Sequence, residues 1–475
     1  AENRINLLYR KDGLWETHDF LDEYDQLLIN TISDNFDGII INIKKKSYEI
    51  QTSLIGSINV FSLVNDRLTF VGTNLDYMIE KSNFNLTYNE RKLNDYFALS
   101  YHALDDLSIY NDIKILQKNT KIIITSEVNY ILDNQEHIYS DMNNNVHFDD
   151  VLHSLTEFSK STIQNTRSKD NLLLLSGGKD SLIGGLLLRL LTKDINSSTQ
   201  GFNVHTNDII SGQKRSDRLF SKSIHHNYFL ENIKYDKLDY DNYAKTLGGF
   251  GPFSSIAYFK YFQHLEKLGF KNYYFSCHFE CTRKKIVSED YFELNNTTPK
   301  EVVGKYFKKK SFYYDNLESI KDEIKNKYLV DPYYQFYFYD RNIQGGYYKS
   351  LLSREFGQRK ITLSNNAEFL NLNYNYIKQK DTFTYDKILD NLLKMNDIKK
   401  NDVVYENLVK SNIKDIPINP QNDLISIKSF YIHLIDKNSN SFFSEMFNLS
   451  KIKHSLITED FGINDHWFLL RLFQV

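Results

Sequence analysis

The stretch NLLLLSGGKDS, from Asn171 to Ser181, decides the fold that this sequence predicts. Four consecutive leucines, Leu172–Leu175, form a short apolar run that ends at once in Ser-Gly-Gly, the pattern of a buried parallel strand followed by a tight turn. Beyond Ser181 the apolar residues recur at the spacing of one helical face, at Leu182, Ile183, Leu186, Leu187 and Leu190. The stretch therefore predicts a strand, a glycine turn and a helix.

This order of elements favours a bound anion. It places the backbone N–H groups of a helix N-terminus beside a loop in which two residues have no Cβ atom, so phosphate is the expected occupant. The loop is not the GxxxxGK[ST] loop of P-loop NTPases, because only one spacing of that pattern, the Gly178-Lys179 pair, fits this sequence. An ordinary Gly-Gly turn capped by Asp and Ser is the alternative interpretation.

The full string SGGKDS, Ser176 to Ser181, resembles the SGGxDS signature of the PP-loop ATP pyrophosphatases. These enzymes cleave ATP to AMP and pyrophosphate while they activate a carboxylate, carbonyl or thiocarboxylate. The resemblance implies that backbone amides and serine hydroxyls hold pyrophosphate, that Lys179 neutralises charge, and that Asp180 binds Mg²⁺. The ATP-binding residues that it implies are Leu175, Ser176, Gly177, Gly178, Lys179, Asp180 and Ser181.

Length and composition limit the remaining possibilities. A chain of 475 residues exceeds the usual size of a single core, so two or three domains are expected. A formal net charge of -3 gives no global argument for nucleic acid or membrane as a partner. Two cysteines, no 18-residue apolar span and no signal peptide predict a soluble cytoplasmic protein.

The first 145 residues predict mostly β structure. Segments rich in Ile, Val, Phe and Thr, bounded by turn formers, predict strands in Gly38–Lys44, Ser53–Val64, Arg67–Thr73 and Thr120–Ser126. Asn65-Asp66 predicts a hairpin between the second and third of these, and a helix is expected near Asn89–His102. The polar run Asp141–His147 marks the boundary between a domain of residues 1–145 and a domain of residues 146–475.

Together with the downstream SGGKDS string, these strands resemble the N-terminal sandwich domain of asparagine synthetases. The stretch IGSINVFSLVNDRLTFVGTNL and the segment LSIYNDIKILQKNTKIII carry this resemblance. Amide-transferring members of that family use a terminal cysteine as the glutaminase nucleophile. No cysteine precedes Cys277, so glutaminase activity is not expected and the domain would be structural or would dock a substrate.

In the second domain, one helix is expected with Asp149 and Asp150 in its first turn, and another over Ser254–Leu268, which ends at Gly269. The stretch Gly201–Asp208 predicts the second strand of the parallel sheet, and the resemblance implies that Val204 or its neighbours lie at the adenine. His205, His225 and His226 lack further ligands at useful spacing, so we interpret them as ordinary polar residues rather than metal ligands.

The segment NYYFSCHFECTR predicts a strand that leads into a loop, where the family carries its second signature, SGxGxDE. Here both glycines are replaced and Cys281 occupies the acid position, so Glu280 is the nearby carboxylate that could bind Mg²⁺ with Asp180. Ser276 and Cys277 would border the nucleotide. Both cysteines could be buried small residues or, alternatively, thiols for sulfur transfer.

Three later segments carry weaker signals. The basic run Lys305–Lys310 predicts a solvated face, with an anionic substrate or nucleic acid as the alternative. Tyr337–Asn342 and Gly357–Phe369 resemble the wall of the family's carboxylate-substrate pocket, with Arg359 in a basic position and Thr362 in place of a proline.

We therefore expect an α/β PP-loop domain, a parallel sheet with flanking helices, joined to an N-terminal antiparallel α+β sandwich. The resemblance implies ATP-dependent adenylation of a carboxylate at Lys179, Asp180 and Glu280, followed by attack of an amine, as in lasso-peptide cyclases and β-lactam synthetases. Peptide or natural-product ring closure is the first choice, with a partner protein that could deliver the substrate. A sulfur or amine transferase acting on RNA or sugar, and a degenerate nucleotide-binding regulator, are the alternatives.

Overall fold

The computed structural model describes residues 4–458 except 12–13, 19–24, 30–38, 45–46, 53–59, 65–67, 74, 83–85, 100–109, 117–119, 126–129, 134–141, 143, 165–170, 202, 223, 234–237, 240–241, 244–245, 247–255, 276–278, 283–286, 309, 329–330, 337–351, 354, 405–431, 433–434 and 437–441. Many side chains inside described helices and strands, including that of Glu280, also lie outside the described part.

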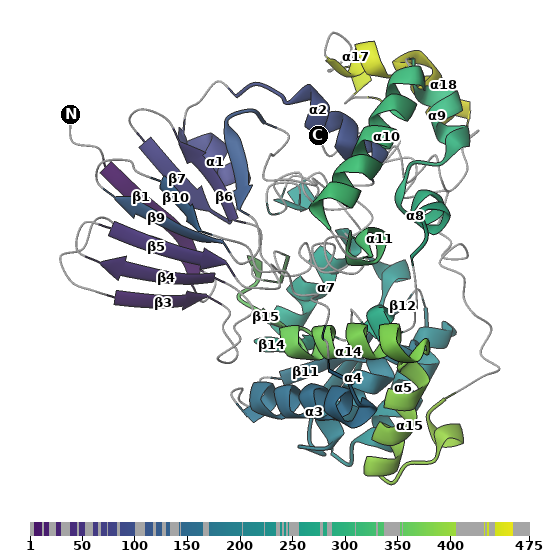
Figure 1. The fold of residues 1–475 in the computed structure, drawn as a ribbon. Helices are drawn as coiled ribbons and strands as arrows, with labels where there is room; N and C mark the ends of the chain where they lie inside the picture. Colours follow the sequence, from purple (N-terminus) through teal and green to yellow (C-terminus); the bar gives the residue numbers. More distant parts are fainter. Residues whose placement is uncertain are drawn as a thin grey trace.

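Two five-stranded sheets form the N-terminal part (Figure 1). The first has the order β2-β1-β7-β6-β8, with β1 (Arg4–Lys11), β2 (Leu14–His18), β6 (Val60–Val64), β7 (Leu68–Gly72) and β8 (Ile113–Leu116). The second has the order β10-β9-β5-β4-β3, with β3 (Asp25–Ile29), β4 (Ile39–Lys44), β5 (Ser47–Thr52), β9 (Lys121–Thr125) and β10 (Tyr130–Asp133). Only the β1–β7 pair is parallel among the described pairs of these two sheets.

The buried side chains of β6 show how the first sheet is covered. Phe61 and Leu63 point to one face and pack with Leu75 and Met78 of α1 (Leu75–Ser82). Val60, on the opposite face, belongs to the larger core, which also contains side chains of β4, β5 and β9. Successive side chains of a strand alternate between faces, so α1 covers one side of this sheet and the main core covers the other.

The predicted strands of this region are confirmed where the structure describes them. β4, β7 and β9 fall inside the predicted ranges, and β6 occupies the end of the predicted range Ser53–Val64. β6 and β7 pair antiparallel, as the predicted hairpin requires, although Asn65-Asp66 itself lies outside the described residues. The predicted helix is α2 (Glu90–Ala98).

A third sheet of five strands is entirely parallel, in the order β13-β12-β11-β14-β15. Its strands are β11 (Asn171–Leu174), β12 (Asn196–Gly201), β13 (His225–Phe229), β14 (Asn272–Phe275) and β15 (Arg359–Thr362). The predicted leucine strand is β11, and it lies at the centre because leucines on both of its faces can be buried.

Helices cover both faces of this sheet. On β12, Ser197 hydrogen-bonds Ser216 of α5 (Asn207–Leu219), whereas the adjacent Ser198 accepts a hydrogen bond from Tyr261 of α7 (Ile256–Lys267). Adjacent residues of a strand point to opposite faces, so α5 and α7 lie on opposite sides. The expected mixed α/β layout, a parallel sheet flanked by helices, is therefore confirmed.

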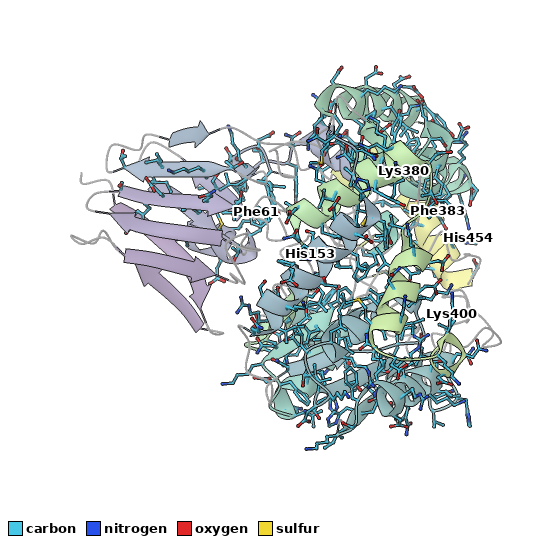
Figure 2. The ribbon with its side chains drawn as sticks, turned by 60° about the horizontal axis from the view of Figure 1, so that its bottom comes forward. Phe61, His153, Lys380, Phe383, Lys400 and His454 are labelled. Carbon is cyan, nitrogen blue, oxygen red and sulfur yellow. The ribbon has the colours of Figure 1, made fainter. Side chains whose placement is uncertain are left out.

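The remaining helices surround these layers (Figures 1 and 2). α3 (Phe148–Gln164) and α15 (Tyr385–Met395) pack against α4 (Lys179–Arg189), and α14 (Ala367–Lys380) packs against α3. In Figure 2, Lys380 and Phe383 mark the connection from α14 to α15. The other described helices are η2 (Leu230–Asn232), η4 (Phe279–Thr282), α8 (Glu289–Asn296), α9 (Lys300–Tyr306), α10 (Lys310–Lys327), α11 (Pro332–Gln335), η6 (Lys400–Asp402), α17 (Phe442–Met446) and α18 (Leu449–Thr458).

Helix α2 contacts α10 across the two parts of the chain. The backbone N–H of Thr298 donates to the carbonyl of Ala98 at 3.1 Å, and Asn316 donates to Asp95 at 3.2 Å. The segment before α3 is likewise fixed, because the Val146 amide donates to Gln379 at 2.9 Å. The division into residues 1–145 and 146–475 stays a prediction.

Candidate functional site

The segment Ser176–Ser181, which we call the SGGKDS loop, leaves the carboxyl end of β11 and enters α4. Gly178 is the N-cap of α4 and has no side chain to cap the helix. The first-turn N–H groups of the helix therefore lie at the edge of the sheet where open parallel sheets bind ligands.

The hydroxyl of Ser181 holds the loop together from inside. It accepts a hydrogen bond from the Ser176 amide at 3.0 Å and lies 2.8 Å from the carbonyl of Gly178, to which it donates. The side chain is buried, so this hydroxyl shapes the loop rather than forming its exposed surface. The Ser176 hydroxyl accepts from the Gly178 amide at 3.2 Å and is more accessible.

Asp208, in the first turn of α5, fixes the loop from the side of β12. Its Oδ1 accepts a hydrogen bond from the Gly177 amide at 2.9 Å. A Cβ atom on Gly177 would lie 2.8 Å from the same oxygen, which is closer than real Cβ contacts allow. A side chain at this position would push the Asp208 carboxylate aside, so glycine leaves room for this hydrogen bond.

Arg215 supports the loop from below, and the sequence interpretation missed it. The side chain is only 2% exposed, and its guanidinium donates to the carbonyls of Ser176 at 2.5 Å and Gly178 at 2.9 Å. Its Nε donates to the carbonyl of Val403 at 2.9 Å, which links the loop to the segment after η6. A buried cation thus lies beneath a loop whose exposed side suits an anion.

Lys179 and Asp180 lie at the start of α4, beside the N-terminus of α15. The Lys179 side chain is 48% exposed, and its Nζ lies 3.9 Å from Oδ1 of the exposed Asp386. Asp180 Oδ1 accepts a hydrogen bond from the hydroxyl of Tyr385 at 2.9 Å. Both charged residues of the predicted signature therefore lie at the carboxyl edge of the sheet, next to the start of α15.

The prediction of a strand over Gly201–Asp208 is wrong. The second strand is β12 (Asn196–Gly201), and the residues that follow form a turn and the start of α5. The sequence NSSTQG lacks the apolar side chains that usually mark a buried strand. The strand can nevertheless be buried, because its serine and threonine hydroxyls form hydrogen bonds within the protein. Val204 follows β12 at the carboxyl edge and is 55% exposed, a position that keeps it available to a ligand.

A hydroxyl network with one histidine lies under the loop. Thr199 donates to the carbonyl of Leu175, and His225 on β13 lies 2.8 Å from the Ser197 hydroxyl and 3.1 Å from that of Thr199. Burial, with a smaller contribution from the charge of His226, lowers the pKa of His225 to about 4. His225 is therefore a neutral hydrogen-bonding residue, while His205 is exposed after β12.

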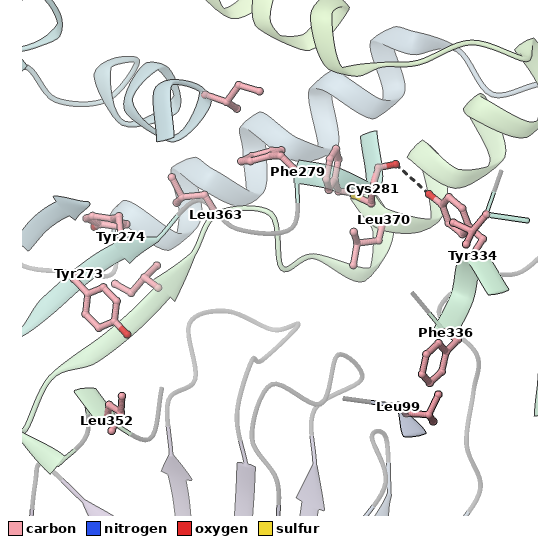
Figure 3. Packing of buried hydrophobic residues seen from close by; sticks show 14 of the residues in the cluster. Leu99, Tyr273, Tyr274, Phe279, Cys281, Tyr334, Phe336, Leu352, Leu363 and Leu370 are labelled. Atoms are coloured by element: carbon pink, nitrogen blue, oxygen red, sulfur yellow. Dashed lines mark hydrogen bonds between the residues drawn. The ribbon is translucent and has the colours of Figure 1, made fainter. Parts of the chain in front are cut away.

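The second predicted loop follows β14, the neighbour of β11 on the other side. Ser276 and Cys277 lie outside the described residues, as does the side chain of Glu280, whose backbone is in η4. Cys281 is 2% exposed and packs in the core (Figure 3). Its carbonyl accepts hydrogen bonds from Tyr334 at 3.1 Å and Asn373 at 3.2 Å. The residue in the acid position is thus part of the core.

The residues of the SGGKDS loop fit a phosphate group, and the Asp180 carboxylate beside them could ligate the Mg²⁺ of a nucleotide, which proteins commonly hold through one or two carboxylates and the phosphates. Two glycines, an accessible lysine and a helix N-terminus converge at the SGGKDS loop. Among the residues that the structure describes, no group of three or more His, Cys, Asp or Glu could hold a metal ion. Of the two carboxylates predicted to bind Mg²⁺, the structure describes the side chain of Asp180, and the assignment of Glu280 stays a prediction.

The other sequence signals lie elsewhere. Tyr337–Asn342 lies outside the described residues. Arg359 begins β15 and Thr362 is buried at its end, next to β14. Lys305 lies over the ring of Tyr306, and Lys308 donates to the Ser444 carbonyl, so these two residues of the basic run contact the protein itself.

No protein-family model matches this chain, and no similar curated protein is found. No helix in the described part of the chain is long and apolar enough to span a membrane.

Proposed function

We propose that this chain is a PP-loop, ATP-dependent amide ligase with an asparagine synthetase-like architecture, which forms AMP and pyrophosphate. One observation carries the proposal. The SGGKDS loop joins the central strand β11 to α4 at the carboxyl edge of a parallel sheet, and Ser181, Asp208 and Arg215 hold its backbone from within. A rigid, glycine-containing loop with accessible Lys179 suits a polyphosphate.

The residues of the loop divide the work. Backbone amides at the start of α4 and the Ser176 hydroxyl would bind phosphate oxygens, and Lys179 would neutralise their charge. Asp180 would hold Mg²⁺, and Glu280 remains the candidate for a second ligand. When bound, Mg²⁺ supplies charge stabilisation for the departing pyrophosphate. The resemblance would put the adenine base near Val204, which is exposed after β12.

The substrate class follows from the resemblance. A carboxylate would be activated as its adenylate, and an amine of the same or a second molecule would attack it. A peptide is the first candidate, delivered alone or by a partner protein in the cytoplasm.

A second candidate, nucleotide binding without catalysis, is favoured by one specific observation. The acid position of the second signature is occupied by Cys281, which is buried and has its carbonyl bound to Tyr334 and Asn373. A side chain in the core cannot bind Mg²⁺ at the sheet edge. If Glu280 does not replace this acid, the phosphate site would remain and turnover would be lost.

The test is product analysis. Protein is incubated with ATP, Mg²⁺, hydroxylamine as a general amine, and a panel of amino acids and short peptides. AMP, pyrophosphate and a hydroxamate are expected, and Asp180→Ala should lower their formation by orders of magnitude. Asp194→Ala is the matched control, since Asp194 is exposed just before β12 at the opposite edge of the sheet. ADP and phosphate as products would contradict the proposal, and ATP binding without products would favour the second candidate.

A further inference from the structure

Two consecutive residues at the start of α15 contact both loops of the sheet edge. The hydroxyl of Tyr385 donates to Asp180 Oδ1 at 2.9 Å, in the SGGKDS loop after β11. The backbone N–H of Thr384 donates to the carbonyl of Thr282 at 3.1 Å, in η4 after β14. Since β11 and β14 are adjacent parallel strands, Thr384 and Tyr385 span the gap between two neighbouring loops.

The contacts of Thr384 are buried and specific. Its hydroxyl donates to Asn373 Oδ1 at 2.5 Å, and the amide nitrogen of Asn373 donates to the carbonyl of Cys281 at 3.2 Å. Thr384 and Asn373 are both fully buried. A hydrogen bond of this kind persists because breaking it would leave buried polar atoms unsatisfied.

Helix α15 is also held at its far end. Asn396, the C-cap of α15, donates through its side chain to the carbonyl of Leu186 in α4 at 3.1 Å. Tyr385 is 4% exposed, so its ring is fixed by packing and its hydroxyl cannot easily turn away from Asp180. The helix is therefore a rigid support for the Asp180 carboxylate.

From this geometry we propose that Tyr385 is a positioning residue, which orients the Asp180 carboxylate for a Mg²⁺–nucleotide complex, and that Thr384 fixes η4 at a set spacing from the same carboxylate. The inference rests on the proposed function. A donor that fixes a ligating carboxylate raises metal affinity without touching the metal. Tyr385 thus acts on Mg²⁺ through Asp180.

The first test is calorimetric titration of ATP over a range of Mg²⁺ concentrations. Tyr385→Phe should raise the Mg²⁺ concentration needed for half-maximal ATP affinity by about tenfold, and should change Mg²⁺-free ATP binding by less than about twofold. Tyr376→Phe is the matched control, because that tyrosine of α14 also loses one hydroxyl contact, which is to Lys387 and not to either loop. An equal loss of ATP affinity with and without Mg²⁺ would indicate a merely structural role and overturn the proposal.

A double-mutant cycle tests the route of the effect. In an Asp180→Ala background, Tyr385→Phe should produce no further change in Mg²⁺ dependence. The same shift in both backgrounds would show that Tyr385 does not act through Asp180.

Hydrogen exchange separates this inference from the proposed function, because it needs no nucleotide. Tyr385→Phe should speed amide exchange in the SGGKDS loop, and Thr384→Val should speed it in η4, each by about tenfold relative to Tyr376→Phe. If wild-type protein binds no ATP, the proposed function fails, and hydrogen exchange alone tests whether Tyr385 and Thr384 hold the two loops in place. Unchanged exchange in both variants would overturn this inference.

Discussion

The loops after β11 and β14 leave the same edge of the same sheet, but they end in different surroundings. In the SGGKDS loop the polar groups are either bonded within the loop, as Ser181 is, or accessible at the edge, as Lys179 is. In η4 the side chains of Phe279, Cys281 and Thr282 are buried. One loop exposes residues at the sheet edge, and the side chains of the other are part of the core.

This difference follows the chemistry of the two strings. SGGKDS contains small and polar residues that can satisfy one another locally, whereas FECT contains two side chains that favour burial. Figure 3 shows Phe279 and Cys281 among the buried hydrophobic residues of the core, which also include Leu363 and Leu370. The residue types of the second loop therefore favour an interior position for its side chains, as observed.

The largest expected effect is a difference in the free energy of unfolding between variants of the two loops. Phe279→Ala removes a fully buried ring that packs edge-on to Phe369, so the free energy of unfolding should fall by about 3–5 kcal/mol. Lys179→Ala, at an exposed side chain, should change that free energy by less than about 0.5 kcal/mol yet weaken ATP binding strongly. Urea unfolding and calorimetry measure the two quantities.

Phe279→Leu, which leaves a smaller cavity, serves if the alanine variant does not fold. Equal stability losses at Lys179 and Phe279 would remove the distinction between a ligand surface and a core turn.

The next effect tests whether the SGGKDS loop is held from below. Arg215→Met removes donors to the carbonyls of Ser176, Gly178 and Val403, and should lower the free energy of unfolding by about 2–3 kcal/mol together with ATP affinity. Arg218 lies about one turn after Arg215 in α5, its side chain is 55% exposed, and it pairs with Asp402, so Arg218→Met should cost at most about 1 kcal/mol. If both arginine variants behave alike, Arg215 has no special role in the loop.

A smaller effect concerns pH and the hydroxyl network beneath the SGGKDS loop. Burial lowers the pKa of His225 to about 4. Between about pH 6.5 and pH 4, His225 is therefore protonated in the unfolded chain but neutral in the folded chain. Stability therefore falls as pH falls through this window, by about 2 kcal/mol between pH 7.5 and pH 5.

His225→Gln keeps hydrogen-bonding capacity without the titration, and it should lose about 2 kcal/mol less than wild type over that pH range, as urea unfolding would measure. His205→Gln, at an exposed side chain, should follow the wild-type curve. A His225→Gln curve that also follows wild type would contradict a neutral buried histidine.

The sequence predicted the fold where apolar patterning was strong. The strands predicted from the leucine run of β11 and from the isoleucine-rich β4 and β9 are confirmed, because apolar residue types of this kind favour buried strands. β12 was assigned to the wrong residues because a strand of serine and threonine is buried only through partners distant in sequence, such as Tyr261 and His225. Patterning alone cannot show such partners.

The site shows the same limit. Asp208, Ser211, Gly212 and Arg215 follow the three-and-four spacing of one helical face, so a polar, small-residue stripe could have pointed to Asp208 and Arg215. No comparable signal marks Tyr385, which reaches Asp180 across 205 positions of sequence. Long-range contacts of this kind depend on packing and require the structure.

The most direct test of the central claim is calorimetric titration of wild-type protein with ATP in the presence of Mg²⁺, compared with the Lys179→Ala and Asp194→Ala variants. If the SGGKDS loop binds the phosphates, wild type and Asp194→Ala should bind one ATP with equal affinity, and Lys179→Ala should bind at least about tenfold more weakly. Absence of ATP binding by the wild type, or equal binding by all three proteins, would contradict a phosphate site at this loop.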